Sequence, residues 1–139
     1  MSQHAVILLL GSNLGNPEEN IEAALRHIRE EIGEIKKVSE IMKTAPVEFV
    51  TSNFFCNIAV LIKTQFSPVK LLESVKIIEK KMGRNKDTFS TKEYLDRIID
   101  IDVVTYGNVK FWSFRLEIPH KKHLYQRDFS KRLLSQLSE

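Results

Sequence analysis

The chain is predicted to adopt an α+β fold in which two helices pack on one face of an antiparallel sheet. Apolar, β-branched runs alternate with two helices that each open on a capping residue followed by proline, and the elements follow the order βαββαβ. With 139 residues, of which 42% are hydrophobic and 28% charged, the chain can build one core. We therefore expect a single domain over residues 1–139.

A short turn joins the first strand to the first helix. Residues 5–10 (AVILLL) are continuously apolar, which is typical of a buried strand. GSNLGN follows as a turn that exposes backbone amides, either as an ordinary connection or beside a ligand. The helix begins at the N-cap Asn16, with Pro17 in its first position, and is expected to end at Gly33.

Two further strands precede the second helix. One is predicted at about residues 35–43 and the next at about residues 54–63, where FFCNIAVLIK is almost wholly apolar. Ser67 and Pro68 repeat the cap-plus-proline signal of the first helix. Gly83 stands where a glycine ends such a helix.

The last third of the chain completes the sheet. Residues 84–96 are polar without periodicity, which indicates a loop that can close over a site. A strand over residues 97–104 follows, then a short strand near 109–113 and a helix over 128–138. The whole order is that of a ferredoxin-like sandwich with a C-terminal addition. Such a sheet leaves one face without helices, where a site can lie.

Two aspartates stand inside the strand predicted for residues 97–104. Alternation places Asp100 and Asp102 on one face and the aliphatic Ile99 and Ile101 on the other. The aliphatic side must face the helices, so the carboxylates lie on the open face. There they suit Mg²⁺, which completes its shell with water and phosphate oxygens. The alternative is a pair of surface aspartates, although aspartate is disfavoured in strands.

Other polar residues leave two interpretations each. Asn57 interrupts an apolar run and must find hydrogen-bond partners, either in the backbone or on a planar heterocycle beside Phe55. His120 follows a proline and is either structural or a phosphate ligand. Residues 110–132 hold seven lysines and arginines against two acids, within a net charge of +3. That excess indicates a polyanionic ligand or a solvated basic surface.

The composition excludes several classes of protein. The six-residue run at 5–10 is far short of the ~20 residues that a membrane span needs. The segment lacks the features of a signal peptide, and the single Cys56 cannot form an intrachain disulfide. We expect a cytoplasmic enzyme or binding domain without membrane association.

Taken together, the motifs resemble a known enzyme family. GSNLG, KTAP, FFCNIAV, LLESVKIIEKKMGR, DRIIDIDVVTYGN, EIPH and QRDF occur in this order over nearly the whole chain. The set is similar to the 6-hydroxymethyl-7,8-dihydropterin pyrophosphokinases of folate biosynthesis. The resemblance implies transfer of pyrophosphate from ATP to the pterin hydroxymethyl group, with AMP as the second product. It also implies two Mg²⁺ ions, a monomer, and neither nucleic acid nor membrane as a partner.

The resemblance further implies roles for individual residues. Asp100 and Asp102 would be the metal ligands and, with Arg97, the catalytic residues. The positions that contact the nucleotide would be Glu79, Lys86, Arg97, Arg115, His120 and Arg127. The pterin pocket would be lined by Thr44, Pro46, Val47, Phe55, Asn57, Tyr94 and Phe129. Tyr94 replaces a tryptophan that is usual in the family, and Lys86 replaces an arginine.

Three rival functions remain open from the sequence. A nucleotidyltransferase also pairs a Gly-Ser turn with an Asp-x-Asp motif, but usually close in sequence, whereas Ser12 and Asp100 are far apart. An RNA-binding ferredoxin-like module stacks bases on sheet aromatics, but the strand here carries two aspartates. A catalytically weakened relative that only binds ATP is the third, because the segment before Arg97 departs from the family pattern.

Overall fold

The computed structural model describes residues 3–44, 54–83, 98–113, 116–121 and 128–138. In these ranges the elements are, in chain order, β1 (His4–Ser12), α1 (Pro17–Glu31), β2 (Gly33–Val38), β3 (Met42–Thr44), β4 (Phe55–Thr64), α2 (Pro68–Lys81), β5 (Asp100–Tyr106), β6 (Phe111–Trp112), β7 (Glu117–Ile118) and α4 (Asp128–Gln136). Within the same ranges, no helix is both long enough and apolar enough to cross a membrane.

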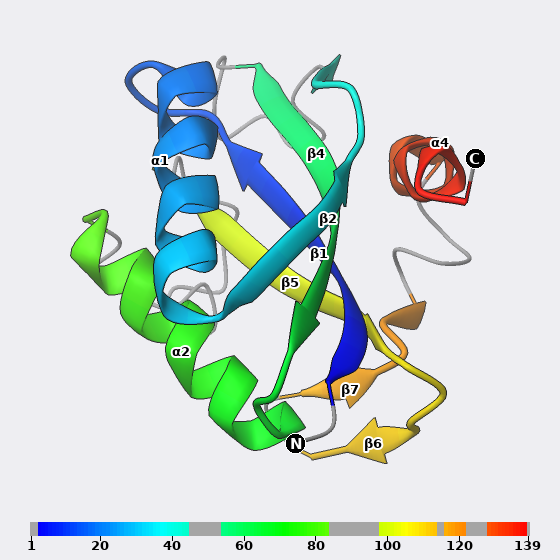
Figure 1. Cartoon of the computed structure of the whole chain (residues 1–139). Helices are drawn as coiled ribbons and strands as arrows, with labels where there is room; N and C mark the ends of the chain where they lie inside the picture. The colour runs from blue at the N-terminus through cyan, green and yellow to red at the C-terminus, as the bar shows by residue number, and fades with distance from the viewer. Residues whose placement is uncertain (1–2, 45–53, 84–97, 114–115, 122–127, 139) are drawn as a thin grey trace.

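The main sheet has the strand order β2-β4-β1-β5, and β3 pairs with β4 as well (Figure 1). All these pairings are antiparallel. The β1–α1–β2 connection passes over β4, and the β4–α2–β5 connection passes over β1. Two interleaved crossovers of this kind define the ferredoxin-like arrangement, so the predicted fold is confirmed. Both crossing helices lie on the same face of the sheet (Figure 1).

Local capping signals start the two crossing helices where the sequence predicted. The Asn16 side chain accepts a hydrogen bond from the Glu19 amide at 3.2 Å. The Ser67 hydroxyl accepts one from the Lys70 amide at 3.2 Å. Each cap satisfies an amide that the first helical turn leaves unpaired. Gly83 has a φ of 104°, which a residue with a side chain rarely adopts, and it follows the end of α2.

The larger core lies between the sheet and the two crossing helices. Alternate residues of β1 and β5 point into it, including Leu8, Leu10, Ile101 and Val103. The helices supply the opposing side, with fully buried Ile21, Ala24, Ile28, Leu71, Val75 and Ile78. The aliphatic side of the aspartate strand therefore does face the helices, as alternation predicted.

The opposite face of the sheet carries a smaller core beneath α4. Leu9, Ala59 and Val104 of the sheet pack there against Leu133 and Leu137. The helix lies across this face in Figure 1, on the side away from the crossing helices. The prediction of a face without helices was therefore wrong in part, because α4 covers the section around Val104. Its amphipathic sequence predicted a helix but not the surface that it covers.

The strand predicted over residues 35–43 is broken into β2 and β3. Ser39 causes the break: its amide donates to the Ala59 carbonyl at 2.9 Å, and its hydroxyl accepts from the Ala59 amide at 2.8 Å. Residues 39–41 thus lie opposite only two residues of β4, as at a β-bulge. The Gln136 side chain accepts from the Glu40 amide at 2.9 Å, so the break also anchors α4.

Gly33 does not end α1 as predicted but opens β2. The helix cap is Ile32, and Gly33 pairs with Thr64. A Cβ atom on Gly33 would lie 2.1 Å from the Lys63 carbonyl oxygen, a contact that no backbone can accept. Glycine is needed here because the β2 and β4 backbones approach each other closely, and not because the backbone turns.

Candidate functional site

The register of the sheet brings predicted site residues from three strands into one row. Gly11 of β1 lies opposite Asn57 of β4 on one side and opposite Asp100 of β5 on the other. Directly opposed residues project from the same face of a sheet. Asn57 and Asp100 therefore flank Gly11 on the face away from the crossing helices. Asp102 lies on this face too, opposite Leu9 of the smaller core.

The lack of a side chain at Gly11 leaves room for the Asn57 side chain in this row. A Cβ atom there would lie 2.8 Å from the Asn57 side-chain oxygen, closer than carbon and oxygen approach without displacement. The sequence predicted a flexible turn at Gly11, but β1 continues through Ser12. Gly11 therefore contributes by having no side chain between the Asn57 amide and the Asp100 carboxylate.

Predicted pterin-pocket residues gather at one end of the row. Asn57 is only 6% exposed, and its amide nitrogen lies 3.4 Å from the Thr44 hydroxyl oxygen as a long hydrogen bond. Phe55 lies opposite Thr44, on the same face. Phe129 packs against the smaller core from α4 and is partly buried. The structure thus combines a hydrogen-bonding amide, a hydroxyl and two aromatic rings on one surface.

The buried cysteine beside Asn57 does not contribute a nucleophile. Cys56 is 3% exposed and points into the larger core. Burial raises the pKa of the Cys56 thiol, which favours the neutral, unreactive form. We assign it a packing role.

Asp100 and Asp102 are half-buried and share the face of the Asn57 row. Among the described residues, no group of three His, Cys, Asp or Glu side chains could by itself hold a metal ion. A carboxylate pair without a third protein ligand fits Mg²⁺, which is usually bound by one or two carboxylates together with substrate phosphates and water. The residues present therefore fit a metal that arrives with a nucleotide.

His120 is attached to the outer edge of the aspartate strand. Its backbone amide donates to the Val104 carbonyl at 2.7 Å, two residues beyond Asp102. The side chain is half-buried, and the preceding Ile118–Pro119 peptide bond is cis. The IPH segment is thus fixed to the strand that carries the predicted metal ligands.

Glu79 is a buried carboxylate next to the aspartate strand. It sits on α2, and its residue is only 2% exposed. One carboxylate oxygen accepts a hydrogen bond from the Ile101 amide at 2.8 Å, at the outer edge of the sheet. The carboxylate thus contacts the backbone between the two aspartates, and the nucleotide contact stays a prediction.

The remaining predicted positions lie outside the described residues. They are Arg97, Lys86, Arg115, Arg127, Pro46, Val47 and Tyr94. The proposed closing loop over residues 84–96 lies outside them as well.

One residue that orders the turn after β1 was missed from the sequence. The Asn20 amide donates to the Ser12 hydroxyl at 3.1 Å and to the Leu14 carbonyl at 2.7 Å. Ser12 is fully buried as a result. Asn20 was hidden because a polar residue in the first helical turns has no distinctive pattern.

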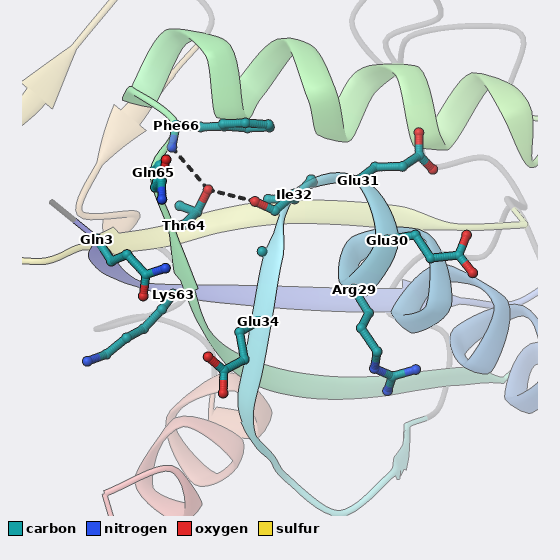
Figure 2. A pocket seen from close by; sticks show the side chains of 11 residues that line it. Gln3, Arg29, Glu30, Glu31, Ile32, Glu34, Lys63, Thr64, Gln65 and Phe66 are labelled. Carbon is teal, nitrogen blue, oxygen red and sulfur yellow. Dashed lines mark hydrogen bonds between the residues drawn. The ribbon is translucent and has the colours of Figure 1, made fainter. Parts of the chain in front are cut away.

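A separate pocket of about 300 Å³ lies at the other end of the sheet. It is lined by charges of both signs, including Arg29, Glu34 and Lys63 (Figure 2). The Thr64 hydroxyl at its base donates to the Ile32 carbonyl at 2.9 Å and accepts from the Phe66 amide (Figure 2). Its lining reaches Gln3 at the start of β1, eight residues and roughly 27 Å of strand from Gly11. None of the predicted site residues within the described ranges lines it.

Comparison with known proteins relates the chain to one enzyme family. Residues 7–139 match the family model for 7,8-dihydro-6-hydroxymethylpterin-pyrophosphokinase. The chain is 33% identical over 134 residues to a Porphyromonas gingivalis 2-amino-4-hydroxy-6-hydroxymethyldihydropteridine pyrophosphokinase, covering 96% of this chain and 90% of the relative. It is 37% identical to the mitochondrial folate synthesis bifunctional protein of Arabidopsis thaliana, over 92% of this chain but only 22% of that protein.

A solved structure supports the fold. The Plasmodium falciparum HPPK-DHPS crystal structure with pteroate superposes with a TM-score of 0.71 at 15% identity, covering 95% of this chain and 38% of that one. By the extent of the family match and the identity to relatives of similar length, the chain belongs to the 7,8-dihydro-6-hydroxymethylpterin-pyrophosphokinase family.

Proposed function

We propose that this protein transfers pyrophosphate from ATP to 6-hydroxymethyl-7,8-dihydropterin in folate biosynthesis. The observation that carries the proposal is the row in which Gly11 separates Asn57 from Asp100. This row supports the proposal because an amide that can bind a heterocycle and a carboxylate that can bind a metal lie on one face of one sheet. The pterin hydroxymethyl oxygen forms a bond to the β-phosphorus of ATP, and the bond from that phosphorus to the α–β bridging oxygen breaks. The hydroxyl proton is lost, and AMP leaves.

The chain's own residues position the two substrates. Asn57 and the Thr44 hydroxyl offer the donors and acceptors that orient a planar heterocycle, and Phe55 and Phe129 offer aromatic surface for stacking. Asp100 and Asp102 would hold two Mg²⁺ ions together with ATP. When bound, the metal neutralises phosphate charge as the transfer proceeds. Transfer of this type depends mainly on positioning and charge neutralisation, so a protein base is not required.

Product analysis tests the proposal directly. The protein is incubated with ATP, Mg²⁺ and 6-hydroxymethyl-7,8-dihydropterin, and nucleotides and pterins are separated and quantified. We expect AMP and pterin diphosphate in equal amounts, and no product without the pterin. ADP as the product would refute pyrophosphate transfer. ATP binding without turnover would instead identify a catalytically weakened relative.

The cellular setting belongs to the same proposal. We expect a cytoplasmic monomer whose ligands are small molecules rather than nucleic acid. The two half-buried carboxylates on this face of the sheet would repel an RNA backbone, which argues against the RNA-binding alternative.

Gly11→Ala is expected to weaken binding of the pterin substrate, while the protein stays folded. The new methyl group would displace the Asn57 side chain, and the lost hydrogen bond should raise the KM for the pterin about tenfold. The KM for ATP should change little. Steady-state kinetics and a thermal melt measure both effects.

The double variant Gly11→Ala/Asn57→Ala distinguishes an effect that acts through the Asn57 side chain from a general distortion of the sheet. If both changes act on the same contact, their effects on the pterin KM are not additive. Additive effects, or an unchanged KM in Gly11→Ala, would show that the space over Gly11 is not used by the pterin.

A further inference from the structure

A buried carboxylate lies against the outer edge of the strand that carries the predicted metal ligands. Glu79 of α2 is 2% exposed, and its Oε2 atom lies 2.8 Å from the Ile101 amide nitrogen. Ile101 is the residue between Asp100 and Asp102. A buried carboxylate is costly unless it is hydrogen-bonded and paired. The Ile101 amide and the Lys76 ammonium, 3.3 Å from Oε1, both offset that cost.

The contact is made at the edge of β5 that faces away from β1. In the part of the chain that the structure describes, β5 is the edge strand next to β1. Alternate residues of an antiparallel strand direct their amides away from the neighbouring strand. The Ile101 amide meets Glu79 instead of β1, whereas Asp100 and Asp102 lie opposite Gly11 and Leu9. β5 is thus held through β1 on one side and through Glu79 on the other.

From this geometry we infer that Glu79 is a positioning residue, whose carboxylate fixes the backbone between the two metal ligands. It acts through Ile101 on the placement of Asp100 and Asp102. Its helix faces the larger core through Val75 and Ile78, on the side of the sheet opposite the aspartate side chains. The inference rests on the proposed function, because only a metal-dependent reaction makes the spacing of the two carboxylates matter.

Two conservative variants of Glu79 show whether the length of its side chain or its negative charge matters. Glu79→Gln keeps an acceptor oxygen at the same reach but removes the negative charge. Glu79→Asp keeps the charge but withdraws the acceptor by one methylene. A positioning role requires the reach, so Glu79→Gln should behave like the parent and Glu79→Asp should not. A nucleotide or metal contact through charge predicts the reverse order.

The first measurement is the Mg²⁺ concentration that gives half-saturation in binding a non-hydrolysable ATP analogue. We expect Glu79→Asp to raise it at least about tenfold, as for other residues that orient metal ligands, and Glu79→Gln to change it less than about threefold. Glu73→Leu, at an exposed position of the same helix, is the matched control and should match the parent. A larger defect in Glu79→Gln than in Glu79→Asp would overturn the inference.

Hydrogen exchange of the Ile101 amide provides a readout that needs neither metal nor turnover. We expect the amide to be protected in the parent and in Glu79→Gln, and to exchange faster in Glu79→Asp than in the parent by at least about tenfold, the factor for one lost hydrogen bond. Equal protection in all three proteins would overturn the inference even if every variant folds. If the parent forms no AMP while these exchange differences hold, the proposed function fails and the anchoring role of Glu79 stands.

Discussion

Asp102→Ala is expected to lose Mg²⁺-dependent turnover by at least about 10²–10³-fold, the usual cost of one electrostatic contributor to a transition state. Asp102 shares the sheet face with Asp100, and the variant removes half of the carboxylate pair that would hold the metal. Thermal stability should be equal to that of the parent or slightly higher, because two carboxylates on the same strand face repel each other. Initial rates across a Mg²⁺ titration, together with a thermal melt, measure both effects.

Two further variants make this result specific. Asp102→Asn preserves size and hydrogen bonding, so it should melt like the parent yet lose most of the activity. Glu117→Ala removes an exposed carboxylate on β7 and should leave turnover unchanged. Ready unfolding of Asp102→Ala would mean that the aspartates are structural. Full activity with normal Mg²⁺ dependence would remove the pair from the mechanism.

Gly33→Ala is expected to cost about 3 kcal/mol of unfolding free energy, the upper part of the range for overpacking. Its Cβ atom would lie 2.1 Å from the Lys63 carbonyl oxygen, and two paired strands would have to separate to relieve the clash. For a domain of this size the melting temperature should fall by roughly 10 °C. Chemical denaturation monitored by circular dichroism measures the free energy.

The matched control adds the same methyl group where there is room. At Gly107, which has a φ of 53°, no atom lies within 4 Å of the added Cβ. Gly107→Ala should therefore cost only about 1 kcal/mol, for the left-handed backbone alone. If Gly33→Ala is no more destabilising than this control, close approach to β4 is not the reason for the glycine.

Features determined by nearby residues could be predicted from the sequence. Asn16 and Ser67 cap their helices through amides three residues away, so their signal is contained in a few adjacent letters. Alternation along β5 likewise placed Asp100 and Asp102 on one face and Ile101 on the other. These rules depend on backbone geometry alone.

Features determined by distant contacts could not be predicted. Ser39 breaks an edge strand because its hydroxyl pairs with Ala59, 20 residues away. Position 33 must be glycine because the Lys63 carbonyl lies close to it. Glu79 accepts a hydrogen bond from the Ile101 amide, 22 residues further along the chain. Each depends on which strands become neighbours, so it is visible only after the sheet has formed. The row through Asn57, Gly11 and Asp100 is of the same kind.

The most direct test of the account asks which end of the sheet binds the substrates. Backbone amide shifts are recorded by NMR before and after adding Mg²⁺, a non-hydrolysable ATP analogue and 6-hydroxymethyl-7,8-dihydropterin. Among the described residues, we expect the largest changes in amide shift at Gly11, Asn57, Asp100 and Asp102. Largest shifts instead around Arg29 and Lys63, at the pocket of Figure 2, would contradict the assignment of the site to the aspartate face.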